Sequence, residues 1–335
     1  MREKCWVALI PLVLMVTAAA ADPPASALVT YQGLCNASAA VAIDGGRFLV
    51  ADDEDKPKTF LRVYRVGHAE GPLSALLLPN DKLDLDPSKD LEVDIEGAAR
   101  IGERVYWIGS HSTNKGGKPR PNRRRLFATK VKTNGSEVQV KVVGQPYKNL
   151  IEDLDRDRDY AAFSLKEAGR RAPKEAGGLS IEGLATTPEG DLLIGFRNPV
   201  PDGKALIARL KNPKGVTEGK SAKFGTPIRL DLGGLGVRSL EWVEALNAYL
   251  IIGGLPGEGA GSRLFRWSGD PGLSPEPVPG IDLTSLNPEA LFVEDRTAIV
   301  LSDDGHRLVN GQERDCAAPG VLKTFRGLQI PLASP

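Results

Sequence analysis

The stretch Ile181-Glu182-Gly183-Leu184-Ala185, followed after a short polar turn by Leu192-Leu193-Ile194-Gly195, is one copy of a strand pair that recurs along the chain. Three further copies also contain a glutamate in the first strand, and a fifth has the apolar pattern without the acid. Their first strands are Ile95-Glu96-Gly97-Ala98-Ala99, Leu240-Glu241-Trp242-Val243, Pro288-Glu289-Ala290-Leu291-Phe292-Val293 and Ala39-Ala40-Val41-Ala42-Ile43. Repeated hairpins are typical of radial all-β folds, so we expect the four carboxylates to converge on one axis.

Third and fourth apolar segments follow most of these hairpins and complete units of roughly 45 to 60 residues, a length typical of propeller blades. The interval between Glu96 and Glu182 is longer than the others. It contains a charged stretch, Asn149 to Lys174, which we interpret as a partly helical insertion on blade two because no further hairpin of the repeat lies within it. The sequence therefore predicts an all-β, five-bladed β-propeller, with six blades as the alternative.

We expect one domain over residues 22–335, with blades at about 37–92, 93–178, 179–235, 236–284 and 285–335. The last unit lacks an obvious fourth strand. The segment 27–34, which begins Ala27-Leu28-Val29-Thr30-Tyr31, is expected to supply that strand and close the ring. Cys35 and Cys316 lie near the two ends of the ring, so a disulfide between them would lock the closure; two free buried thiols are the alternative.

The first residues have the features of a secretory signal peptide. Arg2 and Lys4 precede an apolar run from Trp6 to Val16 and small residues at Ala18 to Ala21, so we assign residues 1–21 to this peptide. A membrane anchor needs about 20 apolar residues, and this run is shorter. We therefore expect a periplasmic or secreted protein without a membrane anchor.

The charge balance excludes one class of function. The chain has 43 Lys and Arg residues against 43 Asp and Glu residues, whereas nucleic-acid binders usually carry a basic excess. The sequence also lacks a Gly-x-Ser-x-Gly motif, a phosphate-binding glycine-rich loop and a zinc-protease helix. The expected partner is a small anionic molecule or an unidentified protein, and the expected state is a monomer.

Several long motifs resemble a known group. They are Val93-Asp94-Ile95-Glu96-Gly97-Ala98-Ala99-Arg100, Tyr106-Trp107-Ile108-Gly109-Ser110-His111, Lys118 to Ala128, Cys35 to Val41, Leu49 to Glu54 and Ile194 to Pro199. Over most of the mature chain the sequence resembles the bacterial family called domain of unknown function 3616, which implies no activity. A looser similarity relates the strand starts to phytase-like propellers and to calcium-dependent apyrases, whose five-bladed propellers hold an axial calcium ion with Glu and Ser side chains. Such architectural similarity does not establish activity.

Carboxylates that converge on an axis repel one another unless a cation compensates them. Ca²⁺ accepts six to eight oxygen ligands in flexible geometry, so we predict a calcium ion held by the repeated acids. The predicted ligands are Glu96, Glu182, Glu241 and Glu289, with oxygens of Ser38 and Ser239 beside them. The alternative is that these acids cap turns or pair with neighbours such as Arg100 and Arg238.

A second polar set follows the second strands and should rim the mouth of the channel. We predict acid–base roles for His111 and Asp53, and anion contacts from Arg123, Arg124, Arg197, Asn198 and Asp303. A histidine hydrogen-bonded within its loop is the favoured alternative for His111, and pairing with acids of the insertion is the alternative for the basic loop. The leading hypothesis is a calcium-dependent hydrolase of a phosphorylated or anionic small molecule; the alternative is a non-catalytic binding propeller with a structural cation.

Overall fold

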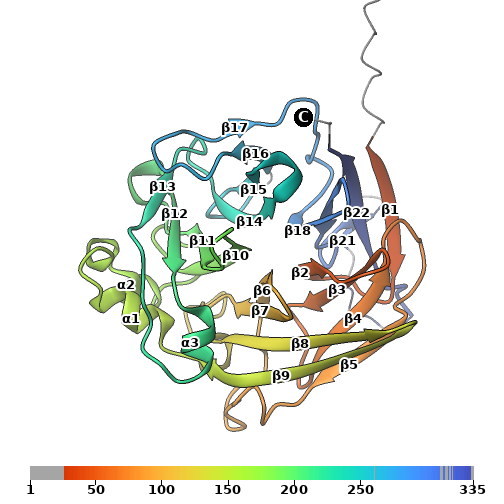
Figure 1. The fold of residues 1–335 in the computed structure, drawn as a ribbon, viewed down its shortest axis with the longest axis horizontal. Helices are drawn as coiled ribbons and strands as arrows, with labels where there is room; N and C mark the ends of the chain where they lie inside the picture. The colour runs from red at the N-terminus through yellow and green to blue at the C-terminus, as the bar shows by residue number, and fades with distance from the viewer. Residues whose placement is uncertain are drawn as a thin grey trace, which may run out of the picture.

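Five four-stranded antiparallel sheets surround a central axis in the computed structural model (Figure 1), which confirms the five-bladed β-propeller. The structure describes residues 26–259, 261–309, 312–313, 316, 318 and 320–332. The expected signal peptide lies outside the described residues. None of the helices in the described part of the chain is long and apolar enough to cross a membrane.

The first four blades are each built from consecutive strands, with the first strand innermost. Blade one contains β2 (Ala37–Ala42), β3 (Arg47–Asp52), β4 (Thr59–Arg65) and β5 (Ser74–Leu78). Blade two contains β6 (Ile95–Ile101), β7 (Arg104–Gly109), β8 (Leu126–Asn134) and β9 (Glu137–Tyr147). Blade three contains β10 (Ser180–Thr186), β11 (Leu192–Asn198), β12 (Ala205–Leu210) and β13 (Ile228–Leu230), and blade four contains β14 (Gly236–Val243), β15 (Ala248–Gly254), β16 (Arg263–Trp267) and β17 (Glu276–Pro277).

Blade five joins the two ends of the chain. Its strand order is β1 (Ala27–Gln32), β22 (Thr324–Pro331), β19 (Thr297–Ser302) and β18 (Pro288–Glu294), so the segment before the first blade is the outer strand of the last one. β1 pairs with β22 from Ala27↔Gln329 to Gln32↔Thr324, and the ring of Tyr31 stacks on Phe325 with centroids 4.9 Å apart. In the chain, β19 and β22 are connected by a segment that contains a separate two-stranded sheet, β20 (Leu308–Val309) and β21 (Gln312–Glu313).

The predicted disulfide is confirmed. Cys35 is bonded to Cys316, 281 positions away along the chain. On the same side of the molecule Asn36 forms an isolated β-bridge with Asp303, and the backbone N–H of Asp304 donates to the carbonyl of Cys35. The disulfide and these backbone contacts therefore hold the segment after β19 against the start of blade one.

The hydrophobic core is divided into five clusters, each lying between two adjacent blades. The second strand of each blade is buried on both faces and so reads as a nearly continuous apolar run, as in β7, which contains Val105, Tyr106, Trp107 and Ile108. The turns between strands use positive backbone φ where it is required, for example at Gly190 with φ +85°. This arrangement fixes the height and direction of each inner strand around the axis.

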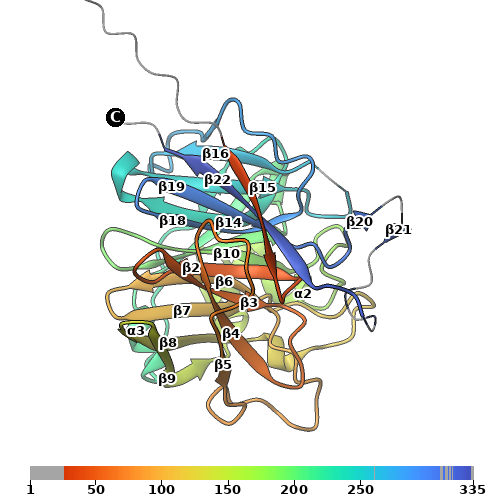
Figure 2. The same ribbon diagram turned by 90° about the vertical axis from the view of Figure 1, so that its right-hand side faces the viewer.

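The predicted insertion on blade two is helical in part. It contains α1 (Leu150–Arg156), η2 (Ala161–Phe163) and α2 (Leu165–Ala168), and its buried leucines join the core cluster between blades two and three. The remaining short helices are η1 (Pro121–Arg123), η3 (Pro201–Gly203), α3 (Pro213–Thr217) and η4 (Glu244–Leu246). In the side view of Figure 2, α2 and the β20–β21 pair lie at one face of the disc and α3 lies at the other.

Candidate functional site

The innermost strand of every blade carries a β-bulge near the same end. The pairing register shifts between Ala37 and Ala39, Ile95 and Gly97, Ile181 and Gly183, Val237 and Ser239, and Pro288 and Ala290. A bulge leaves one residue outside the ladder and redirects its side chain. The bulged residues are Ser38, Glu96, Glu182, Arg238 and Glu289, and they define one equivalent position in the five blades.

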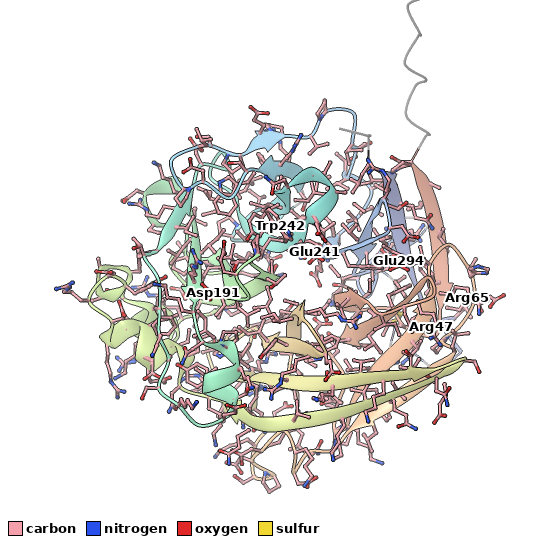
Figure 3. The ribbon with its side chains drawn as sticks, in the orientation of Figure 1. Arg47, Arg65, Asp191, Glu241, Trp242 and Glu294 are labelled. Carbon is pink, nitrogen blue, oxygen red and sulfur yellow. A yellow bond between two sulfur atoms is a disulfide. The ribbon has the colours of Figure 1, made fainter. Side chains whose placement is uncertain are left out.

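The prediction that Glu241 belongs to this position is wrong, because Arg238 occupies it in blade four. Glu241 lies three residues further along β14, opposite Leu250, and is not among the residues that line the cavity at the mouth. Figure 3 shows Glu241 beside the channel on the inner strand of its blade. A small residue follows each bulge because neighbouring inner strands approach closely: a Cβ on Gly183 would lie 2.6 Å from Leu240.

The bulged acids open into a polar cavity of about 710 Å³ at one end of the channel. It is lined by nine carboxylates and seven Lys or Arg side chains, so the numbers of negative and positive groups are nearly balanced. The carboxylates are Asp53, Glu54, Glu92, Asp94, Glu96, Glu182, Glu258, Glu289 and Asp303, and the cations are Lys56, Lys115, Arg120, Arg123, Lys174, Arg197 and Arg238. Two sides of the mouth differ in how these charges pair.

On the side of blades three to five, arginines compensate the acids. Glu182, which is only 4% exposed, accepts a hydrogen bond from Arg197 at 2.9 Å and lies 3.4 Å from the Nε of Arg238. Arg238 also pairs with Glu289. Arg197 is anchored in addition to the carbonyls of Leu255 at 2.8 Å and Gly257 at 2.9 Å. Glu182 and Glu289 therefore pair with Arg238, which is the alternative that the sequence left open for the ring acids.

On the side of blades one and two, three carboxylates face one another. Asp53, Asp94 and Glu96 each place one oxygen so that all three lie within 4.8 Å of one another. Burial, reinforced by repulsion from Asp94 and Glu182, raises the pKa of Glu96 well above its usual range. Burial and repulsion from Asp303 and Glu289 likewise raise the pKa of Asp53. Among the described residues no Lys or Arg pairs directly with Glu96, so this group is short of positive charge.

Asp94 is held in place by a polar network. Its backbone has φ +56°, and its carboxylate accepts a hydrogen bond from Ser110 and lies 2.8 Å from Arg123. Burial raises the pKa of Asp94 to about 6, although Arg123 acts to lower it. Arg123 also pairs with Glu92, whose second oxygen lies 2.6 Å from Lys56. A non-glycine residue with positive φ is strained, and such strain concentrates at functional sites.

Asp94 and Arg238 belong to the site but were not predicted from the sequence as its members. Asp94 is two residues before Glu96, and alternate residues of an extended segment share a face, so this spacing was a usable signal. Arg238 precedes the small residue Ser239, as each ring residue precedes a small one. Matching the copies on that small residue, instead of on the acid, would have found it.

Several predicted residues lie away from the cavity or are used by the scaffold. His111 is fully buried, its Nδ1 contacts the Gly109 carbonyl at 2.9 Å, and burial lowers its pKa to about 4; it does not line the cavity. Arg124 pairs with Glu152 of α1 at 2.8 Å, which is the pairing with acids of the insertion that was the alternative for the basic loop. It lines a different surface pocket.

The two predicted serine ligands and Asn198 make structural hydrogen bonds. The Ser38 hydroxyl donates to the carbonyl of Ile95 at 2.6 Å, and the Ser239 hydroxyl accepts from the N–H of Leu291 at 3.1 Å, so each links its blade to the next one. Neither lines the cavity. Asn198 donates to the carbonyls of Pro173 and Glu175 and thereby fixes the end of the insertion beside the mouth.

Asp303 and Asp53 lie at the mouth, as expected. Asp303 accepts hydrogen bonds from Asn287 at 3.1 Å and from the N–H of Gly305 at 2.8 Å. One carboxylate oxygen of Asp53 is buried and has no hydrogen-bond partner among the described residues. The structure thus brings together Asp53, Glu96, Arg123, Arg197, Glu182, Glu289 and Asp303 from the predicted set.

The family described as "Protein of unknown function (DUF3616)" matches residues 36–136 and 126–280. The chain belongs to this family. The matched segments contain Asp53, Asp94, Glu96, Glu182 and Arg238, and end before Glu289. A search of the curated proteins finds no match.

Solved structures match this member of the family at low sequence identity. The PQQ-bound aldose sugar dehydrogenase of Streptomyces coelicolor is 12% identical, with 92% of this chain and 100% of that chain covered and a TM-score of 0.42. A Bacteroides ovatus xyloglucan GH43B structure is 14% identical, with coverages of 90% and 54% and a TM-score of 0.49. A Dyadobacter fermentans protein of unknown function is 13% identical, with coverages of 88% and 76% and a TM-score of 0.42. Similarity at this level carries no inference about activity.

Proposed function

We propose that the acidic side of the mouth binds a calcium ion and that the protein hydrolyses a phosphorylated or otherwise anionic small molecule there. The observation that carries this proposal is the convergence of Asp53, Asp94 and Glu96 within 4.8 Å. Two oxygens bound to one Ca²⁺ at about 2.3–2.6 Å lie at most about 5 Å apart, so the three carboxylates fit a shared ion. Zinc is a poor fit because the set offers neither His nor Cys.

The position of this ion differs from the one expected at the sequence level. Arg238 interrupts the ring of acids and pairs with Glu182 and Glu289. We therefore expect the carboxylates to stabilise a bound cation most beside Glu96, between blades one and two, and not on the axis. The proposed ligands are Asp53, Asp94 and Glu96; Glu241, Ser38 and Ser239 are not proposed again.

Cations at the same mouth suit an anionic substrate. Lys115 is exposed and has no ion pair among the described residues, and Arg120 lies 3.7 Å from the carboxylate of Asp90. Lysine and arginine bind phosphate oxygens through charge-assisted hydrogen bonds. A cavity of about 710 Å³ is within the range of small-molecule sites.

The chemistry follows from these two subsites. A bound divalent ion polarises a phosphoryl oxygen and lowers the pKa of a water bound to it. Asp53 lies beside the proposed ion and burial raises the pKa of its carboxyl, so we propose it as the group that accepts a proton from the attacking water. His111 has no part in this proposal, because it is buried behind the cavity wall.

Calorimetric titration of calcium into the metal-free protein tests the ion site. Wild type should bind one ion, and Asp53→Asn and Glu96→Gln should each weaken binding at least tenfold. Glu241→Gln is the matched control, because it removes an acid from the same channel but outside the cavity. Equal affinity of the two site variants and wild type would contradict the assignment.

Phosphate release from a panel of phosphate esters, with and without calcium, tests the hydrolysis. One observation favours a second candidate, a non-catalytic binding propeller with a structural cation: His111, which was predicted to handle protons, is buried and does not line the mouth. Calcium binding without turnover on the panel would select that candidate. Export of the protein and its monomeric state belong to the same proposal, and the disulfide is consistent with export.

A further inference from the structure

A second concave site lies at the other end of the inner strands, between blades two and three. It has a volume of about 810 Å³ and is formed by the β6–β7 turn, β8, and the segment from Lys211 to Lys223 that contains α3. β6 begins at the mouth with Ile95 and Glu96 and ends here at Ile101, so the two sites are separated by roughly 17 Å of strand. Figure 2 shows α3 on the face opposite the β20–β21 pair.

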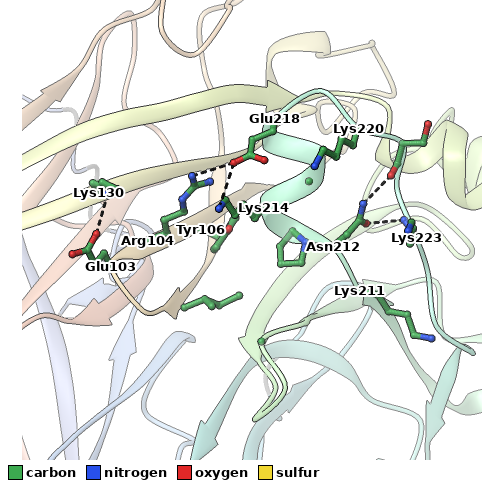
Figure 4. A pocket seen from close by; sticks show the side chains of 15 residues that line it. Glu103, Arg104, Tyr106, Lys130, Lys211, Asn212, Lys214, Glu218, Lys220 and Lys223 are labelled. Atoms are coloured by element: carbon green, nitrogen blue, oxygen red, sulfur yellow. Dashed lines mark hydrogen bonds and ion pairs between the residues drawn. The ribbon is translucent and has the colours of Figure 1, made fainter.

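This second site, here called the basic pocket, has a clear excess of positive charge. Six cationic side chains line it against two carboxylates, Glu103 and Glu218. The cations are Arg104, Lys130, Lys211, Lys214, Lys220 and Lys223. Figure 4 shows both acids engaged: Glu103 pairs with Lys130 at 2.9 Å, and Glu218 lies 3.5 Å from Arg104.

Three lysines of the basic pocket are uncompensated. Lys211, Lys220 and Lys223 are exposed, and none has an ion pair within the described part of the chain. Lys214 lies 3.9 Å from Glu218, and the same carboxylate also pairs with Arg104. Like charges held around one concavity raise the local positive potential and favour an anion there.

The backbone that carries these lysines is braced. Asn212 donates from its side-chain amide to the carbonyl of Ser221 at 2.8 Å and accepts from the N–H of Lys223 at 2.8 Å. The N–H of Lys211 donates to the carbonyl of Lys223 at 2.8 Å, and Leu210 forms a β-bridge with Phe224. The segment is thus closed on itself, which lowers the ordering cost of binding a ligand.

We propose that the basic pocket binds a small molecule with two or more linked phosphate groups. Several uncompensated positive charges at one pocket favour a multiply charged anion over a single phosphate. Lysine is a compact point charge with three donors and suits phosphate oxygens in varied orientations. The pocket volume of about 810 Å³ lies within the range of small-molecule sites. This site is independent of the calcium site proposed at the mouth.

Calorimetric titration with inorganic tripolyphosphate, at low ionic strength and with EDTA present, tests the proposal. The full-length protein should bind tripolyphosphate at least tenfold more tightly than orthophosphate. The triple substitution Lys211→Ala, Lys220→Ala and Lys223→Ala should weaken binding at least tenfold, and the corresponding triple arginine variant should retain it. Lys89→Ala, which removes an exposed lysine outside the pocket, should leave it unchanged.

The controls separate the outcomes. Asp53→Asn at the mouth should not affect tripolyphosphate binding, which shows that the lysines and not the mouth cations hold the probe. Pyrophosphate and a nucleoside diphosphate distinguish a free phosphate chain from a phosphorylated organic molecule: equal affinities assign the former and tighter nucleotide binding the latter. The proposal is overturned if the triple alanine variant, shown to be folded by its thermal transition, binds like wild type, or if wild type does not prefer tripolyphosphate to orthophosphate.

Discussion

Replacing Glu241 with glutamine is expected to stabilise the protein at neutral pH. Glu241 is half-buried beside the channel and has no ion pair or hydrogen bond to the rest of the described chain, and burial raises its pKa from 4.5 to about 8. The unfolded chain therefore ionises Glu241 near pH 4.5, while the folded protein keeps it protonated up to about pH 8. The contribution of protonated Glu241 to the free energy of unfolding is complete below pH 4.5 and is lost as the pH rises through 8.

The magnitude follows from this shift. Each pKa unit corresponds to about 1.36 kcal/mol, so the penalty at pH 7 is up to about 3 kcal/mol. Because water reaches part of this side chain, we expect Glu241→Gln to add about 2 kcal/mol to the free energy of unfolding at pH 7. The gain should shrink toward zero near pH 4 and become constant above about pH 8.

Urea unfolding of both proteins between pH 4 and 9 measures this difference. Glu182→Gln provides the contrast, because it removes the carboxylate that pairs with buried Arg197 and leaves Arg238 with Glu289 alone; it should destabilise the fold by about 3–5 kcal/mol. A Glu241→Gln protein that is no more stable than wild type at pH 7, or whose gain does not depend on pH, would refute the reasoning.

Three further predictions concern charge and closure. Calcium affinity should rise between pH 5 and 7, since burial raises the pKa of Asp94 to about 6 and its proton must leave before the ion binds; calorimetry that gives equal affinities would contradict this. Arg238→Met should lower the free energy of urea unfolding by about 3–5 kcal/mol, because it leaves buried Glu289 without its arginine and Glu182 with Arg197 alone, whereas exposed Arg65→Met should change it by less than about 0.5 kcal/mol. Replacing Cys35 and Cys316 together with serine should cost about 2–4 kcal/mol in the same assay, and an unchanged midpoint would show that pairing of the first and last strands closes the ring by itself.

The blade count was accessible from the sequence because it depends on local signals. Alternating apolar runs, turn dipeptides and the unusually long interval after Glu96 are each set by a few adjacent residues. The disulfide followed from ring closure, which brings Cys35 and Cys316 together. None of these inferences requires the register of one strand to be known to a single residue.

The ring position was harder because it depends on the bulges. A shift of one residue turns a side chain to the other face of a strand. In blade four the ring position was assigned to Glu241, three residues beyond Arg238, which occupies that position in the structure. Aligning the copies on the shared acid therefore concealed Arg238. The compensation of Glu182 and Glu289 by arginines also depends on side chains from different blades, which a single sequence does not order in space.

The location of the polar rim was predicted in part. Asp53 and Asp303 reach the mouth because they follow second strands that end there. His111 follows such a strand as well, but its backbone φ of +58° and the contact with the Gly109 carbonyl fold it into the interior. Strand order can place a residue at an edge, but local backbone conformation decides whether its side chain faces solvent.

The shared last blade also sets an order on folding. β1 is synthesised before all other strands, yet its partner β22 is synthesised last, so β1 has no ladder to join while the intervening blades form. Contacts between such distant segments form slowly, because the entropy of closing a long loop is lost before the contacts can stabilise the chain. β19 also lacks its outer partner until β22 is synthesised, and its unpaired edge is then a site for misassembly. Completion of the ring is therefore expected to be a late event in folding.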